Sequence, residues 1–280
     1  MYTTHFVTND PISSEVLNTG LQTAYHDLGN GEALLLVHGF TGSKLDFQDH
    51  LDWLGASHRV IAYDQRGHGE SSNIGPYNLY GLAADLIGLL NALDIDKCHV
   101  LGHSLGGMVV MRALLANPER FHSAIFMDTA PYAVKLFDKK IATQLNSMVM
   151  AGGCSALLPG MLSQPQNSVV QRGIDYLGEA EHWRRIRVKL EQMDAKAFVE
   201  LTNTLANQPS VLNALAGLKL PTTIITGEHD RPFLQAGKDM HTKLPNSQLI
   251  TITDAGHCPQ YENAQGWATA VACHFSNWAA

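Results

Sequence analysis

Charged residues and cysteines are both scarce in this chain of 280 residues. Only 16% of the residues are charged, the formal net charge is −7, and lysine and arginine form no long run. This balance argues against binding to nucleic acid or to an anionic membrane surface. The cysteines are scattered, without a CxxC pair: Cys98, Cys154, Cys258 and Cys273. We therefore expect reduced thiols and a cytoplasmic protein.

Targeting, membrane and metal-binding signals are also missing. The start of the chain, residues 1–6, lacks the basic-then-apolar layout of a secretory signal. No apolar run approaches the length needed to span a bilayer, so we expect no membrane association. The fourteen histidines are dispersed without an HExxH spacing, and we expect neither a metal nor another cofactor. With 45% hydrophobic residues, the chain is predicted to be an ordinary globular protein, as a monomer or a homodimer.

The first 130 residues alternate between short apolar runs and helical patterns. Residues 21–28 alternate like an exposed antiparallel strand, and the continuous apolar run 33–37 is typical of a buried parallel strand. Further strands are expected at 59–64, 98–101 and 123–127, with helices at 44–54, at 79–93 and after residue 104. This alternation predicts an α/β fold with a doubly wound, mostly parallel β-sheet.

The alternation stops at Pro131, and only helical patterns follow as far as about Asn207. This block has breaks at 152–153, at 159–160 and at Pro165, and one long helix is expected at 179–206. Strand patterns return at 222–227 and 248–252, with helices at 235–243 and 264–278. We therefore predict a core of residues 1–130 and 208–280, interrupted by a helical cap insertion of residues 131–207.

The segment Gly102-His103-Ser104-Leu105-Gly106 lies directly after the apolar run 98–101 and before a helical pattern. It fits the G-x-S-x-G nucleophile elbow, a sharp strand-to-helix turn that exposes one serine hydroxyl. The glycines are needed because the turn is strained, and a Cβ at either of them would collide with the neighbouring helix or strand.

Four more motifs accompany this elbow: His38-Gly39-Phe40, 66–71 (RGHGES), 227–230 (GEHD) and Gly256-His257. In this order they resemble the α/β-hydrolase-fold enzymes, specifically serine hydrolases of the carboxylesterase type with a helical cap. The resemblance spans nearly the whole chain apart from the insertion. It implies a serine nucleophile, a histidine base and a carboxylate.

The resemblance implies Ser104 as the nucleophile and His257, in the turn after the last strand, as its base. A serine hydroxyl needs such a base within hydrogen-bond reach. Asp230 fits the carboxylate, because the order Ser, Asp, His is the one expected for this fold. Glu228 lies two residues earlier and is expected to point elsewhere. Asp128 is the other alternative, since a minority of such enzymes carry their acid at the end of that strand.

A tetrahedral oxyanion needs preorganised donors. The N–H of Leu105, at the start of the elbow helix, is one candidate, and by resemblance the N–H of Phe40 is the other. The Phe40 ring would then line the acyl pocket. His103, next to the serine, is expected to pack rather than to act as the base.

The insertion is rich in methionine, leucine and glycine, which suit an adaptable substrate pocket. The residues predicted to line that pocket are Met148, Leu157, Leu158 and Met161. The same block carries a run of cations, expected to form a solvated helix face: Arg184, Arg185, Arg187 and Lys189.

We therefore predict a serine hydrolase that cleaves small-molecule carboxylic esters with short to medium acyl chains through an acyl-enzyme, without a cofactor. Hydrolysis of C–C bonds in dienoic acids is disfavoured by His103 and Cys258, where those enzymes often carry asparagine and tryptophan. The segment 38–44 also resembles the menaquinone-pathway lyase that eliminates pyruvate, but Met108 stands where that family tends to have arginine. A lactonase, a perhydrolase and a non-catalytic ligand receptor remain alternatives.

Overall fold

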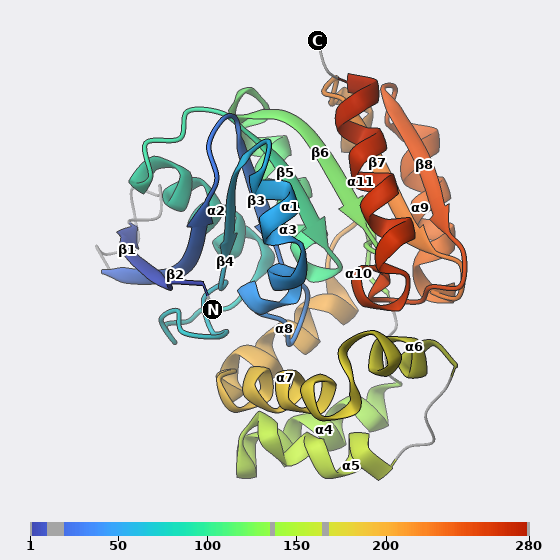
Figure 1. Cartoon of the computed structure of the whole chain (residues 1–280). Helices are drawn as coiled ribbons and strands as arrows, with labels where there is room; N and C mark the ends of the chain where they lie inside the picture. The colour runs from blue at the N-terminus through green and yellow to red at the C-terminus, as the bar shows by residue number, and fades with distance from the viewer. Residues whose placement is uncertain (1, 10–19, 135–137, 164–167, 279–280) are drawn as a thin grey trace.

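An eight-stranded sheet runs through the centre of the protein (Figure 1). The computed structural model describes residues 2–9, 20–134, 138–163 and 168–278. The strands are β1 (His5–Asn9), β2 (Leu21–Leu28), β3 (Ala33–Val37), β4 (Arg59–Tyr63), β5 (Cys98–His103), β6 (Phe121–Met127), β7 (Thr222–Gly227) and β8 (Ser247–Ile252). Their order in the sheet is β1-β2-β4-β3-β5-β6-β7-β8. All neighbours are parallel except β1–β2 and β2–β4, which confirms the doubly wound, mostly parallel sheet.

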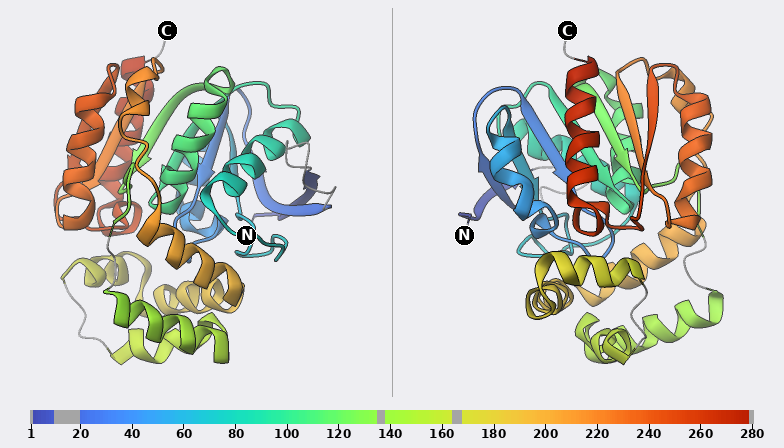
Figure 2. Two further views of the ribbon diagram at one scale, coloured as in Figure 1. Left: turned by 180° about the vertical axis from the view of Figure 1, so that it is seen from behind. Right: turned by 45° about the vertical axis from the view of Figure 1, so that its right-hand side comes forward.

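Helices cover both faces of this sheet (Figure 2). One face packs against α2 (Leu79–Ala92), α3 (Leu105–Ala116) and α9 (Arg231–Lys243), and the other against the 3-10 helix η1 (Lys44–His50), α1 (Leu51–Gly55) and α11 (Ala264–Trp278). The core strand β3 is buried at all five positions, as its continuous apolar sequence predicts. The remaining short helices of the core are η2 (Pro118–Arg120), η4 (Ala214–Gly217) and α10 (Pro259–Glu262).

Two details of the core differ from the sequence-based expectation. Strand β1 was not expected, because its pattern is short; it forms by pairing antiparallel with β2. The helix expected at 44–54 is a 3-10 segment followed by a short α-helix, and Ser43 and Asp46 form a capping box at its start.

The inserted helices lie at the carboxyl ends of the strands (Figure 1). They are α4 (Lys139–Gly152), η3 (Cys154–Leu157), α5 (Leu158–Ser163), α6 (Ser168–Leu177), α7 (Glu179–Glu191) and α8 (Ala195–Asn207). The single helix expected at 179–206 is wrong: the chain breaks between α7 and α8, where the Asp194 side chain accepts the Lys196 N–H (3.1 Å) and caps a new helix. The expected break at Pro165 lies outside the described residues.

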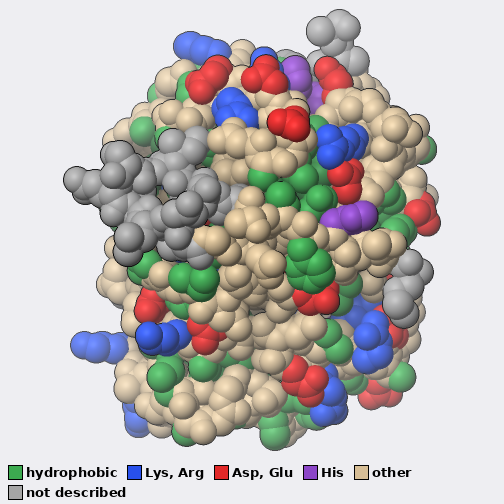
Figure 3. All heavy atoms as spheres, turned by 90° about the vertical axis from the view of Figure 1, so that its left-hand side faces the viewer, with side chains coloured by type: hydrophobic (Ala, Val, Ile, Leu, Met, Phe, Trp, Pro, Cys, Tyr) green, Lys and Arg blue, Asp and Glu red, His purple; other side chains and the backbone are tan. Residues whose placement is uncertain are grey.

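The surface charge and the lengths of the helices are relevant to the binding of charged partners and to insertion into a membrane. Acidic and basic side chains are interspersed over the coloured part of the face in Figure 3, so that part carries no field of one sign. In the described part of the chain, no helix combines the length and the apolar character that crossing a bilayer requires.

Gly106 of the elbow and the adjacent Gly107 allow β5, α3 and the loop after β3 to meet. A Cβ on Gly106 would lie 2.3 Å from the carbonyl oxygen of Val37, and one on Gly107 would lie 2.6 Å from the Thr129 side chain. Such distances are too short for a carbon atom, so the backbone would have to move. The close approach therefore depends on glycine at these positions.

We predict that Gly106→Ala lowers the free energy of unfolding by about 2–3 kcal/mol, because the methyl group overpacks a rigid junction. For a chain of this size the melting temperature should fall by about 5–10 °C in calorimetry. Gly217→Ala is the matched control, because a Cβ there meets nothing within 4 Å. Equal stability of the two variants would contradict this account of the elbow.

Candidate active site

Ser104 occupies the turn between β5 and α3 in a strained backbone conformation, with φ 52° and ψ −118°. The turn is fixed on both sides: the Ser104 N–H donates to Met127 O (2.9 Å), and the Thr129 hydroxyl donates to Ser104 O (2.6 Å). Ser104 is only 5% exposed, whereas the elbow motif predicts an exposed serine hydroxyl, because the loop at Gly39 packs against the Ser104 Cβ. A non-glycine residue is held at positive φ only by such surrounding contacts.

His257 lies between Ser104 and Asp230. Its Nε2 is 2.9 Å from the Ser104 Oγ, and its Nδ1 is 2.7 Å from the Asp230 Oδ2. The Phe233 ring on α9 stacks on the imidazole with centroids 4.9 Å apart. With Nδ1–H donating to the carboxylate, Nε2 is the acceptor for the serine hydroxyl, which is the tautomer a general base requires.

The two alternative carboxylates occupy other positions. Asp128 Oδ1 accepts the N–H of Gly227 (2.8 Å), and burial together with the nearby Asp230 raises the pKa of Asp128 well above its usual value. Glu228 is exposed and accepts the N–H of Asp254 (2.9 Å). The ion pair to His257 is made by Asp230.

The turn that carries His257 is held by residues on either side of it. The Glu262 Oε2 accepts the N–H of Gly256 (2.7 Å) and the N–H of Cys258 (3.1 Å). The buried His103 donates from Nε2 to the His257 carbonyl (2.7 Å), and burial lowers the pKa of His103 to about 3, so its ring is neutral. Sequence reasoning missed Glu262, because no motif marks it.

The two candidate oxyanion donors flank the serine. Leu105 is the first residue of α3, so its N–H belongs to the positive end of that helix. Phe40 follows Gly39, where a Cβ would lie 3.1 Å from the Ser104 Cβ. Among residues with described positions, neither the Phe40 nor the Leu105 N–H donates a hydrogen bond. Both amides are therefore available to a ligand at Ser104.

A cavity of about 520 Å³ extends from Phe40 between the inserted helices and the core. Its lining includes Phe40, Thr41, Ile141, Leu145, Met148, Leu157, Gly160, Met161, Ile186, Lys189, Leu190 and Phe198. Three predicted pocket residues of the insertion are thus present. Leu158 is absent from the lining and is buried in the hydrophobic core, at 6% exposure. This correction could not be made from sequence, since the two leucines are adjacent.

Comparison with known proteins settles the family. A family described as "alpha/beta hydrolase fold" matches residues 32–264. This chain belongs to the α/β-hydrolase fold family.

Individual relatives of this α/β-hydrolase carry different names. The "Putative 2-succinyl-6-hydroxy-2,4-cyclohexadiene-1-carboxylate synthase" of Bacillus subtilis is 27% identical over 256 residues, covering 88% of this chain and 92% of its own. The "Putative carbamate hydrolase" of Pseudomonas syringae is 27% identical, covering 80% and 86%. A solved thermophilic esterase from Thermogutta terrifontis superposes with a TM-score of 0.83 at 24% identity, covering 99% of both chains. The structural likeness concerns the fold.

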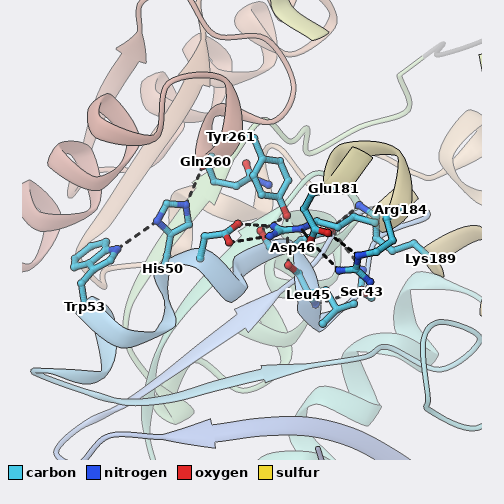
Figure 4. A network of polar contacts seen from close by, with 12 residues as sticks. Ser43, Leu45, Asp46, His50, Trp53, Glu181, Arg184, Lys189, Gln260 and Tyr261 are labelled. Atoms are coloured by element: carbon cyan, nitrogen blue, oxygen red, sulfur yellow. Dashed lines mark hydrogen bonds and ion pairs between the residues drawn. The ribbon is translucent and has the colours of Figure 1, made fainter. Parts of the chain in front are cut away.

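Ion pairs attach the inserted helices of this α/β-hydrolase to its core (Figure 4). Lys189 on α7 pairs with Asp46 (2.7 Å), whose carbonyl also accepts the Tyr261 hydroxyl (2.7 Å). Arg185 pairs with Asp49 (Nη2–Oδ1 2.9 Å) and is 7% exposed. The prediction that these cations form a solvated helix face is therefore wrong for Arg185 and Lys189, which form ion pairs with carboxylates of the core.

One group of described residues has ligand atoms close enough for a metal: Glu228, His229 and Asp254, within 4.8 Å of one another. All three are exposed, and Asp254 already pairs with Arg172 (2.6 Å). We assign no metal to this group.

We predict that a small p-nitrophenyl phosphonate labels Ser104 stoichiometrically, because its hydroxyl faces the His257 acceptor. Peptide mass spectrometry locates the label. Ser104→Ala should take up none, and His257→Ala should be labelled on the order of a thousand times more slowly. A stoichiometric label on another serine would contradict Ser104 as the nucleophile.

Proposed function

We propose that this α/β-hydrolase is a serine hydrolase that cleaves carboxylic esters through an acyl-enzyme. The observation that carries this proposal is the continuous hydrogen-bonded series from Ser104 through His257 to Asp230. In the first step the Ser104 Oγ attacks the ester carbonyl while His257 Nε2 takes its proton. Asp230 stabilises the imidazolium, which then gives the proton to the leaving alcohol. Water activated by His257 hydrolyses the acyl-enzyme in the second step.

The oxyanion of each tetrahedral intermediate is proposed to accept the N–H groups of Leu105 and Phe40. These donors are fixed by α3 and by the loop after β3, so they need no reorganisation as charge develops. The loop is anchored by His38, whose Nδ1 lies 2.8 Å from Gly39 O and whose Nε2 accepts the Gln65 N–H (3.0 Å). Burial lowers the pKa of His38 to about 4, which keeps this acceptor neutral.

The acyl chain is proposed to occupy the apolar cavity beside Phe40, against Met148, Leu157 and Met161. The single lysine of its lining, Lys189, is already neutralised by Asp46. A cavity of this character favours an uncharged hydrocarbon group over a polyanion.

A lyase that eliminates pyruvate is the second candidate, because the Bacillus subtilis relative carries a related name. Against it, Met108 is buried and contacts the Gln208 amide, so it supplies no charge for a carboxylate. Turnover of a panel of acyl esters, lactones, carbamates, dienoic acids and the pyruvate-eliminating substrate discriminates the candidates. If the protein converted only the substrate that eliminates pyruvate, the lyase would replace the esterase as our proposal.

We predict that Asp230→Asn lowers kcat for an ester by on the order of a thousandfold or more, because the amide favours the wrong histidine tautomer. Asp128→Asn is the matched comparison and should change kcat much less, since the Asp128 carboxyl lies beside Asp230 and accepts the Gly227 N–H, while the ion pair to His257 is made by Asp230. Steady-state kinetics of both variants provide the measurement. A severe loss for Asp128→Asn with a mild one for Asp230→Asn would reverse the assignment.

We predict that p-nitrophenyl esters with acyl chains of short to medium length, below about ten carbons, give the highest kcat/KM. Each methylene gains at most about 0.8 kcal/mol until the cavity is full, and overpacking follows. Leu157→Trp should lower kcat/KM for hexanoate about tenfold relative to acetate. Leu162→Trp is the matched control, because Leu162 is exposed and does not line the cavity. An optimum at ten carbons or longer, or activation at an oil–water interface, would indicate a lipase instead.

A further inference from the structure

Arg112, in the middle of α3, carries a buried charge without a carboxylate partner. It is 3% exposed, and its Nη1 donates to Met108 O (2.9 Å) while its Nη2 donates to Gln208 Oε1 (2.9 Å) and to Pro209 O (3.3 Å). The Nε is buried and has no acceptor. Among residues whose positions are described, no carboxylate forms an ion pair with this guanidinium.

The other buried arginines of the described chain do have such partners. Arg66 pairs with Asp85, and Arg185 pairs with Asp49. A buried charge whose neighbours are all neutral is costly, because carbonyl and amide dipoles replace water only in part. The positive charge of Arg112 is therefore only partly stabilised by its neighbours, and a bound anion would stabilise it further.

A second cavity, of about 440 Å³, lies beside this charge and away from Ser104. Arg112 lines it together with Tyr80 from α2 and Asn203 from α8, and no carboxylate is among its lining residues. Tyr80 is 62% exposed, and the centroid of its ring lies 5.4 Å from the guanidinium carbon. The Tyr80 ring therefore lies over the guanidinium where both residues line the cavity.

The amino end of α2 opens into the same cavity. Asn78 caps this fourteen-residue helix, accepting the N–H groups of Tyr80 (3.1 Å) and Gly81 (2.9 Å), and it also lines the cavity. The positive end of the helix dipole therefore adds to the field of Arg112. Two independent features, a helix amino end and an unpaired buried cation, favour negative charge in the same place.

We propose that this cavity between α2, α3 and α8 binds a small monocarboxylate, with Arg112 as its charge partner. One guanidinium balances one negative charge, and its planar donors match a carboxylate. Leu79 and Pro209 supply apolar wall for a short hydrocarbon group. This site is separate from the triad and does not depend on the proposed esterase activity.

The position of the site ties it to the inserted helices. Gln208, which accepts from Arg112, is the first residue after α8 and donates to the carbonyl of Tyr132 (3.1 Å), where the chain leaves the core. A bound carboxylate therefore lies against the junction of the insertion with the core, and we expect it to raise the thermal stability of that junction.

The test is an NMR titration of the full chain with sodium butyrate at constant ionic strength set by sodium chloride. We expect saturable shifts at α2 and α8 amides with a dissociation constant in the millimolar range. Asn203→Asp places a fixed carboxylate in the cavity, and it should weaken butyrate binding at least tenfold and raise the melting temperature. Asn213→Asp, the same charge change at an exposed residue outside the cavity, should leave both unchanged.

Butyrate could also bind near Ser104 as a product analogue, and the variants separate the two locations. Binding at the triad would be equal in the wild type and in Asn203→Asp, and that result would overturn the proposal. Absence of saturable shifts in the wild type would overturn it as well. Neither result bears on esterase activity, which is measured separately.

Discussion

The strained turn at Ser104 is the constraint on which the rest of this structure depends. A serine keeps a positive φ only if surrounding contacts hold its backbone in place. Ser104 is held by hydrogen bonds to the Met127 carbonyl and from the Thr129 hydroxyl, and by the close contact of the neighbouring glycines with β3. The parallel sheet can therefore be understood as a rigid frame that holds one hydroxyl at the carboxyl ends of its central strands.

Polar contacts attach the inserted helices at their edge, while apolar contacts line their inner surface. The ion pairs of Arg185 and Lys189 lie between α7 and the segment after β3, near the loop that carries Phe40. Substrate volume and oxyanion geometry are consequently linked, because the same short segment of the core borders both. A shift of α7 would alter the cavity and the loop together.

The sequence predicts the parts of the site that depend on local patterns. The elbow, the strand ends and the order of the motifs predict that Ser104, Asp230 and His257 lie close together, since the carboxyl ends of parallel strands converge. In the structure His257 is within hydrogen-bond distance of both Ser104 and Asp230. Glu262 and Arg112 could not be predicted, because their roles depend on contacts between chain segments that no local pattern encodes. Leu158 was misplaced for a related reason: at a junction of 3-10 and α-helix, the helical phase of adjacent leucines is undefined.

The two crossings of the chain between core and insertion lie side by side. The N–H of Val211 donates to the carbonyl of Pro131 (2.7 Å), so the chain returns to the sheet at almost the point where it departs. Insertions or deletions within residues 132–207 therefore leave the register of β6 and β7 unchanged. The inserted helices, and with them the range of substrates that fit the cavity, can therefore change in evolution while the core that carries Ser104 and His257 stays the same.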